Sequence, residues 1–197
     1  MLKNEDKDLM WEEVSCEHIV QDEWIDFRKT EYRFPDGRTF SPFYSYSRRD
    51  YVVIVATDVE GNFICVRQFR HGIREVTTEF VAGGIERTDG REYGGTQDGA
   101  SEAALLAAKR ELLEESGYES DEWEHIITIP SNATVSDNYA FLFRAKNCHK
   151  VAEQSLDEME CLNVVKLSRE EIQQRMKQGK FQQAIHVLAL MLADKMG

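Results

Sequence analysis

The sequence has few cysteines and prolines and no long hydrophobic run. Its four cysteines, Cys16, Cys65, Cys148 and Cys161, form no CxxC pair and no regular spacing, so neither a disulfide framework nor a zinc site is expected. No window approaches about 18 uninterrupted apolar residues, which excludes a membrane-spanning helix. Only three prolines occur among 197 residues, and no Pro- or Gly-rich linker, repeat or low-complexity tract divides the chain. We therefore expect one domain, or one domain with an arm.

Positive charge is also scarce. Lys and Arg number 24 against 36 Asp and Glu, which gives a formal net charge of −12. Such a chain repels a nucleic-acid backbone unless its basic residues are segregated, and no basic run is longer than pairs such as Arg48-Arg49. An acidic protein can still bind phosphates if its carboxylates hold divalent cations. The acidic N-terminus does not resemble a signal peptide, so a cytoplasmic location is expected.

Hydrophobic residues make up 42% of the chain, enough for a sizeable core. Their pattern predicts extended segments within 24–48, a hairpin of two core strands at 51–69, a strand at 76–82 and a polar loop at 86–101. A helix at 101–116 follows, then two further strands, a strand at ECLNVVKL, a helix at 169–178 and another near 181–195. Residues 1–20 show no firm periodicity. This order of strands and helices predicts an α/β sandwich with a mixed sheet.

The helix at 101–116 is the strongest local signal in the chain. Ser101 is a suitable N-cap, and Gly117 is a suitable C′ residue. Its interior consists largely of Ala, Leu, Glu, Lys and Arg, which have high helix propensity. An apolar face that can anchor the helix to a core is formed by Leu105, Ala108 and Leu112.

Three glutamates lie together on this helix. Glu111, Glu114 and Glu115 are spaced i, i+3 and i+4, which places them within about a 100° arc of the helix surface. Arg110 can pair with Glu114 at i+4, but one arginine leaves two carboxylates over. Clustered carboxylates suit Mg²⁺ or Mn²⁺, whereas a solvated acidic face is the alternative interpretation. Spacing alone leaves both interpretations open.

The charged residues of this helix resemble the Nudix box. The matching positions are Glu102-x7-Arg110-Glu111-Leu112-x-Glu114-Glu115-x-Gly117-Tyr118, and every charged position of the box is present at its spacing. The box normally has a glycine followed by five residues before its first glutamate. The context FVAGG indicates Gly83 as this glycine, with 18 residues between it and Glu102. The 13 extra residues (18 − 5) are interpreted as a surface-loop insertion, which loop-closure entropy tolerates.

The flanking segments resemble ADP-ribose and nucleoside-diphosphate-sugar pyrophosphatases over roughly residues 30–190. FPDGRTF, the strands before the box and LDEMECLNVVKLS carry this likeness, whereas Ala133 stands where these enzymes often have a proline. The resemblance implies a Nudix-type α/β/α sandwich with a mixed β-sheet. It also implies an antiparallel N-terminal β extension at 1–48, in contact with a partner in a homodimer, before a Nudix domain at 49–197.

The resemblance also implies a metal site. Glu111 and Glu115 are expected to be the principal ligands of Mg²⁺ or Mn²⁺, together with the backbone carbonyl of Ala82. In the loop before the ECLNVV strand, Glu158 is expected to be the catalytic base and Glu160 a further metal ligand. A solvated acidic loop is the alternative interpretation for this last pair.

Further roles follow from the same likeness. Glu114 is expected to belong to the catalytic residues. It either joins the metal ligands or pairs with Arg110. Glu102 is expected to be a structural partner of Arg110. Arg70 and Gly84 are expected to bind substrate, with the Arg70 guanidinium clamping a phosphate or ribose. For Arg70, a surface ion pair is the alternative interpretation.

The expected reaction is metal-dependent hydrolysis of a small-molecule nucleotide, with ADP-ribose split into AMP and ribose 5-phosphate as the first candidate. Another nucleotide sugar such as GDP-mannose is an alternative substrate. A Nudix module that senses a nucleotide without cleaving it is the alternative function, and loss of a box glutamate would favour it. None of these glutamates is lost. No nucleic-acid or membrane partner is expected.

Overall fold

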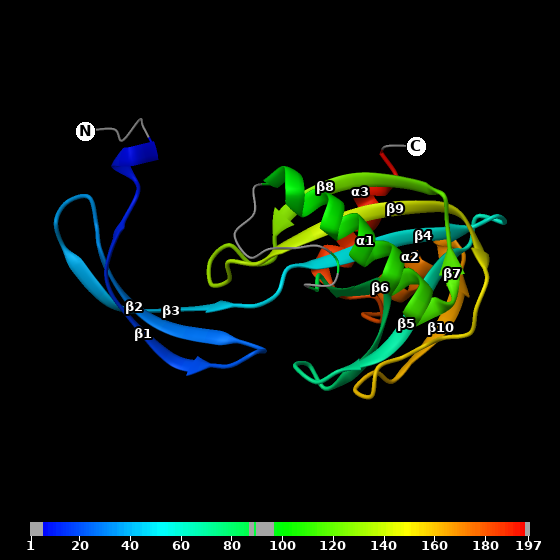
Figure 1. Cartoon of the computed structure of the whole chain (residues 1–197), viewed down its shortest axis with the longest axis horizontal. Helices are drawn as coiled ribbons and strands as arrows, with labels where there is room; N and C mark the ends of the chain where they lie inside the picture. The colour runs from blue at the N-terminus through cyan, green and yellow to red at the C-terminus, as the bar shows by residue number, and fades with distance from the viewer. Residues whose placement is uncertain (1–5, 87–88, 90–96, 196–197) are drawn as a thin grey trace. The chain divides into compact units, whose positions relative to one another are not determined.

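The computed structural model describes residues 6–86, 89 and 97–195. The chain divides into two compact units: Met1–Arg49 with Pro130–Asn138, and Asp50–Ile129 with Tyr139–Gly197. In chain order the described elements are a 3₁₀ turn (Asp6–Asp8), β1 (Glu12–Gln21), β2 (Asp26–Arg33), β3 (Thr39–Ser47), β4 (Tyr51–Asp58), β5 (Phe63–Arg70), β6 (Glu75–Gly84), α1 (Gln97–Ser116), β7 (Tyr118–Glu119), β8 (Glu122–Pro130), β9 (Tyr139–Lys150), β10 (Leu162–Leu167), α2 (Arg169–Lys177) and α3 (Ala184–Ala193) (Figure 1).

Among the residues that the structure describes, the larger unit contains a seven-stranded sheet. Its strand order is β10-β5-β6-β4-β9-β7, with β8 pairing beside β9. β4 and β9 are parallel, whereas β6 is antiparallel to both β4 and β5, so the predicted mixed sheet is confirmed. β6 pairs with β5 through its first half and with β4 through its second half. The sheet therefore curls around this strand.

Helices cover both faces of the curled sheet (Figure 1). Apolar side chains of α1, among them Ala104, Ala108 and Leu112, pack on the face that carries Val52 and Ile54. Residues of α2 and α3 pack on the opposite face of the sheet. β4 is buried on both sides, which explains its almost continuous apolar sequence. The α/β/α layering predicted from the sequence is confirmed.

The smaller unit contains a three-stranded antiparallel sheet in the order β1-β2-β3. One side of this sheet carries an aromatic cluster in which Trp11 contacts Tyr32, Phe34 and Phe43 at ring-centroid distances of 4.5 to 5.9 Å. Several of its large apolar side chains remain exposed, including Trp11 and Phe40. Three strands with aromatic cross-strand contacts are enough to form a sheet, but this one buries little of its surface.

Three details differ from the sequence predictions. β1 occupies part of the N-terminal region that showed no periodicity. β4 and β5 do not form a ladder, because they pair at Thr57 and Phe63 alone before diverging to other partners. α1 begins at Gln97, so Ser101 lies inside the helix rather than at its N-cap. Much of the predicted loop at 86–101 lies outside the described residues.

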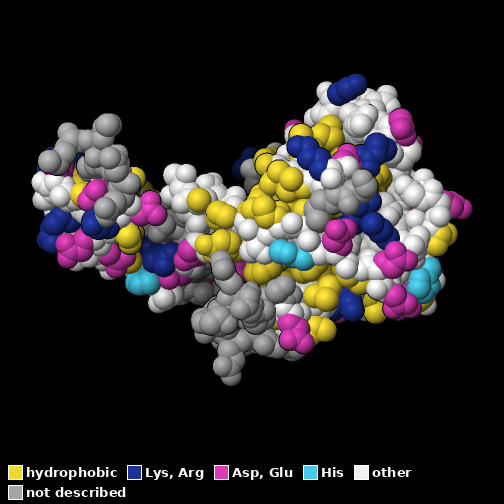
Figure 2. All heavy atoms as spheres, turned by 90° about the horizontal axis from the view of Figure 1, so that it is seen from above, with side chains coloured by type: hydrophobic (Ala, Val, Ile, Leu, Met, Phe, Trp, Pro, Cys, Tyr) yellow, Lys and Arg dark blue, Asp and Glu magenta, His cyan; other side chains and the backbone are white. Residues whose placement is uncertain are grey.

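Other local predictions are confirmed. Ser168 and Glu171 form a capping box at the start of α2. Gly117 ends α1 with a φ of 75°, in the left-handed region that favours glycine. Within the part of the chain that the structure describes, no helix is long and apolar enough to span a membrane. On the face drawn in Figure 2, Lys and Arg side chains are interspersed with Asp and Glu on both units.

Candidate active site

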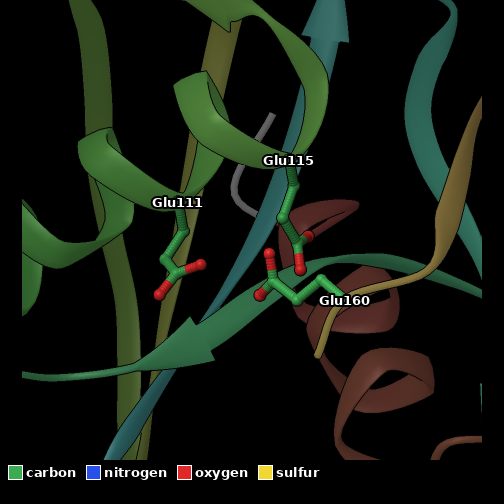
Figure 3. A group of neighbouring side chains, drawn as sticks. All are labelled: Glu111, Glu115 and Glu160. Carbon is green, nitrogen blue, oxygen red and sulfur yellow. The ribbon is translucent and has the colours of Figure 1, made fainter. Parts of the chain in front are cut away.

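Three carboxylates from distant parts of the sequence meet beside the sheet. Glu111 and Glu115 project from α1, and Glu160 approaches from the loop before β10 (Figure 3). One carboxylate oxygen from each residue lies within 4.8 Å of the others. Glu111 and Glu115 are only 6% and 3% exposed, whereas Glu160 lies at the more open side. The structure thus brings together three of the residues that the sequence analysis assigned to a metal.

The electrostatics of this cluster disfavour three negative charges. Burial raises the pKa of Glu115 to about 9, with further contributions from the charges of Glu111 and Glu160. Burial likewise raises the pKa of Glu111 to about 7, although Arg110 opposes this shift. Carboxylate oxygens that converge in a buried site and repel one another are suitable ligands for a hard divalent cation. The residues present therefore fit Mg²⁺ or Mn²⁺.

The end of α1 is fixed by the segment that follows β9. The backbone N–H groups of Val151 and Ala152 donate to the carbonyl of Gly117, at 2.9 and 3.2 Å. Ser155 N–H donates to the carbonyl of Glu114 at 2.9 Å, and the side chain of Gln154 donates to the carbonyl of Glu115 at 2.7 Å. Carbonyls at a helix C-terminus have no partner within the helix, and this segment supplies partners for them. It also leads the chain directly towards Glu160.

A tight turn then places Glu160. Its backbone N–H donates to the carbonyl of Asp157 at 2.9 Å, and its carboxylate accepts the Asp157 N–H at 3.0 Å. Because the chain turns here rather than running extended, Glu158 and Glu160 do not share a face. Glu160 joins the carboxylate cluster, whereas Glu158 is exposed outside it. The assignment of Glu158 as the base stays a prediction.

β6 lies beneath the glutamates of α1. The N–H of Ala82 points to the Glu115 carboxylate at 3.4 Å, so Ala82 lies beside the cluster, and the role of its carbonyl as a metal ligand stays a prediction. Gly83 lies directly against Glu111, because a Cβ atom at this position would be 2.0 Å from the Glu111 carboxyl carbon. Only glycine leaves this space free. The contact supports Gly83 as the box glycine despite the long insertion that follows.

Arg110 connects α1 to β6 and to the insertion. It donates to the carbonyl of Gly84 at 3.0 Å and to the carboxylates of Glu111 and Glu114, both at 2.9 Å. Its remaining donors contact Asp89, which is buried at 6% exposure. The structure therefore places Gly84 and Glu114 at Arg110. Glu114 lies at the rim of the site with its side chain 41% exposed.

The expected partnership between Glu102 and Arg110 is absent. Within the described part of the chain, Glu102 is exposed and makes no ion pair with Arg110. Asp89 takes that place, and sequence reasoning missed it because an acidic residue in a polar insertion carries no distinguishing pattern. Glu102 precedes Arg110 by about two turns of helix, whereas Asp89 lies close to Gly84, whose carbonyl Arg110 also contacts.

Arg70, at the end of β5, pairs with a fully buried carboxylate. Its Nε donates to both oxygens of Glu79, at 2.9 and 3.1 Å, and its Nη2 donates to Glu79 as well. Burial opposes ionisation of Glu79, but the hydrogen bonds and charge of Arg70 outweigh it and lower the pKa of this carboxyl. Arg70 is thus held by a buried ion pair rather than a surface one. Its role in substrate binding stays a prediction.

His186, from α3, contacts the same buried group. Its Nδ1 accepts the backbone N–H of Phe80 at 3.1 Å, and its Nε2 lies 4.0 Å from Glu79. Burial lowers the pKa of His186 to about 4, although the charge of Glu79 opposes this shift. The imidazole is therefore neutral at pH 7. Neither Glu79 nor His186 was assigned a role from the sequence, because isolated charged residues in a strand or helix give no signal of pairing.

A family model for the NUDIX domain matches residues 47–186. The chain belongs to the Nudix family. The interpretation of the chain as a Nudix pyrophosphohydrolase is confirmed at the level of the family. Nudix hydrolases generally use divalent metal ions, in agreement with the chemistry of the carboxylate cluster.

Similar proteins cover nearly the whole of this Nudix chain. It is 27% identical over 173 residues to the ADP-ribose pyrophosphatase of Bacillus subtilis (strain 168), covering 84% of this chain and 82% of that protein. It is 24% identical over 184 residues to the methanol dehydrogenase activator of Bacillus methanolicus, covering 90% and 89%. A crystal structure of an ADP compounds hydrolase matches with a TM-score of 0.75 at 19% identity, covering 94% of this chain and 92% of that one. This last likeness shows the shared fold.

Proposed function

We propose that this protein is a divalent-cation-dependent hydrolase that cleaves the diphosphate of a nucleoside diphosphate linked to a sugar. The observation that carries the proposal is the convergence of Glu160 with the buried carboxylates of Glu111 and Glu115 beside β6. Three carboxylates that converge at one site are suited to hold a cation that faces the charge of a diphosphate. A bound cation neutralises the diphosphate and acidifies the attacking water.

The residues around the cluster have separate roles in this proposal. Glu111, Glu115 and Glu160 would hold Mg²⁺ or Mn²⁺ together with the carbonyl of Ala82, and Glu114 would contribute from the rim. Glu158 would accept a proton from the attacking water, since it lies in the same loop as Glu160 and is exposed to solvent.

Two positions beside the cluster would contact the substrate. Arg70 retains its Nη1 group for a phosphate or ribose oxygen while Glu79 holds the rest of its guanidinium. Gly84, at the end of β6, would allow close approach of the substrate to the backbone.

ADP-ribose is the proposed substrate, with AMP and ribose 5-phosphate as products. The B. subtilis relative is named an ADP-ribose pyrophosphatase, which supports this choice. Another nucleotide sugar such as GDP-mannose is the second candidate for the same chemistry. The relative named a methanol dehydrogenase activator favours a regulatory role as a different class of function.

A panel experiment separates these possibilities. The purified protein is incubated with ADP-ribose, GDP-mannose and other nucleoside diphosphate derivatives, each with Mg²⁺ and with Mn²⁺. Product release is followed as phosphate that a phosphatase can liberate. ADP-ribose should give the highest kcat/KM, and chelation should abolish turnover. Tight nucleotide binding without turnover of any compound would favour the sensing module.

We also propose that the protein is a two-fold symmetric homodimer, with residues 1–48 as the extension in dimer contact and 49–197 as the catalytic domain. The exposed apolar side chains of β1 to β3, among them Ile19, Val20 and Phe40, support an interface on this sheet. Light scattering at micromolar concentration should give the mass of a dimer. A monomer mass would contradict this proposal.

A further inference from the structure

The donors of Arg110 are fully used. A guanidinium has five N–H bonds in a rigid planar fork. Nε donates to Asp89 Oδ1 at 3.2 Å, and Nη2 donates to Asp89 Oδ2 at 3.2 Å and to the carbonyl of Gly84 at 3.0 Å. Nη1 donates to Glu111 and Glu114. Each of the five N–H groups therefore has an acceptor. Because the guanidinium is planar and rigid, the two bonds from Nε and Nη2 to Asp89 also fix the direction of Nη1.

Asp89 is itself fixed in place. Its Oδ2 accepts the backbone N–H of Glu86 at 2.8 Å, and its own N–H donates to the carbonyl of Glu86 at 3.2 Å. These bonds tie Asp89 to Glu86, shortly after β6, within the insertion that separates Gly83 from the box helix. A buried carboxylate needs such partners, and Asp89 has them from the backbone and from Arg110.

Charge balance gives Asp89 a second effect. Arg110 is the cation that contacts Glu111, and its attraction competes with that of a divalent cation for the same carboxylate. Asp89 partly neutralises Arg110 through a bidentate interaction, which weakens the attraction of Arg110 for the glutamate cluster. Removing the charge of Asp89 would leave the Arg110 guanidinium free to rotate. It would also strengthen the attraction between Arg110 and Glu111.

We propose that Asp89 is a positioning residue of the metal site, acting through Arg110 to orient Glu111 and Glu114. The inference rests on the proposed function, since it requires that the glutamate cluster holds a divalent cation. It assigns the inserted segment a part in building the site. It also assigns to Asp89 the role that the box pattern gave to Glu102.

Binding of Mn²⁺ to the substrate-free protein tests this directly, with free Mn²⁺ measured by electron paramagnetic resonance. Asp89→Asn should raise the dissociation constant of Mn²⁺ about 10-fold, the lower end for loss of a residue that orients a metal ligand. Glu102→Gln is the matched control and should stay within about twofold of the wild type. Asp89→Glu, which keeps the charge, should recover most of the affinity. At saturating Mn²⁺ the kcat of Asp89→Asn should approach that of the wild type.

A double-variant cycle shows whether Asp89 acts through Arg110. Arg110→Lys should weaken Mn²⁺ binding because an ammonium cannot reproduce the fork, and adding Asp89→Asn to it should cause little further loss. This comparison also serves if Asp89→Asn alone folds poorly. Independent, multiplicative losses would overturn the inference, as would unchanged affinity in Asp89→Asn or an equal loss in Glu102→Gln. If the wild type binds no Mn²⁺, the proposed function fails too, whereas normal wild-type binding with a silent Asp89→Asn removes this inference alone.

Discussion

The Cα of Gly83 lies against the carboxylate of Glu111, so closely that a methyl group on Gly83 would stand 2.0 Å from the Glu111 carboxyl carbon. The obstructed atom is the end of a flexible side chain, not backbone. A larger residue at this position can therefore be accommodated by moving Glu111. β6 and α1 are therefore in close contact at Glu111, the first glutamate of α1 that belongs to the cluster.

Gly83→Ala should accordingly affect the site more than the fold. We expect the Mg²⁺ concentration for half-maximal rate to rise at least about 10-fold, since Glu111 is displaced, with a small change in melting temperature. Gly72→Ala is the matched control, because a Cβ at Gly72 meets nothing within 4 Å. A loss of folding with unchanged metal dependence in the molecules that remain folded would contradict this prediction.

The buried carboxylate of Glu115 is expected to be essential. Glu115→Gln removes a charged ligand at the most buried point of the cluster, and kcat at saturating Mg²⁺ should fall by at least about 10²-fold. Glu170→Gln, at an exposed position in the first turn of α2, should retain wild-type activity. Full activity of Glu115→Gln would show that the cation is held elsewhere.

The two loop glutamates should behave differently. Glu160→Gln should raise the Mg²⁺ concentration for half-maximal rate, because Glu160 reaches the cluster. Glu158→Gln should lower kcat and leave the Mg²⁺ requirement unchanged, because Glu158 lies outside the cluster. Steady-state rates over a Mg²⁺ titration separate the two effects. If Glu158→Gln has wild-type kcat, then the base is another residue, with Glu114 the next candidate.

The buried network behind Arg70 should contribute a loss of stability in mild acid, whereas the raised pKa values of Glu111 and Glu115 act in the opposite direction. The pKa of His186 is lowered to about 4 from an ordinary value of 6.5, so the unfolded chain binds this proton first as the pH falls. The contribution of His186 to the free energy of unfolding should therefore decrease between pH 6.5 and pH 4, by at most about 1.4 kcal/mol per pH unit. The lowered pKa of Glu79 acts in the same direction at lower pH.

Urea unfolding at pH 7, 6 and 5 measures this slope. His186→Gln should be less stable than the wild type at pH 7, and the difference in unfolding free energy between the two proteins should become smaller on acidification. His71→Gln, at an exposed turn position, should keep the wild-type slope. Equal slopes in all three proteins would show that protonation of His186 does not limit stability in acid.

The elements that could be predicted are those with one strong physical signal. α1 combines high helix propensity with an apolar face that is buried as expected at Ala108 and Leu112. β1 could not be predicted in the same way, because almost all of its residues are exposed on both faces and so show no alternation. The partners of β4 were also hidden, since a strand buried on both faces has no pattern that indicates its neighbours.

The same distinction applies to the site. Helical spacing predicts that Glu111 and Glu115 share a face, because that depends on local geometry alone. Glu160 lies 45 residues after Glu115 (160 − 115), and its proximity depends on tertiary structure, so only the family likeness indicated it. Asp89 depends on the conformation of an insertion that the family pattern does not contain.

The segment that follows β9 runs along the end of α1 and is bonded to the carbonyls of Glu114, Glu115 and Gly117. Its length is therefore constrained between two fixed points, the helix terminus and the turn that ends at Glu160. One residue added between Ser155 and Asp157 could shift Glu160 by about 3.3–3.6 Å, comparable to the spread of the whole carboxylate cluster. The connection before α1 accommodates 13 extra residues, yet a single one after Ser155 would separate the third carboxylate from the other two. The site thus tolerates a change of chain length in the connection between β6 and α1, but not in the segment between Ser155 and Glu160.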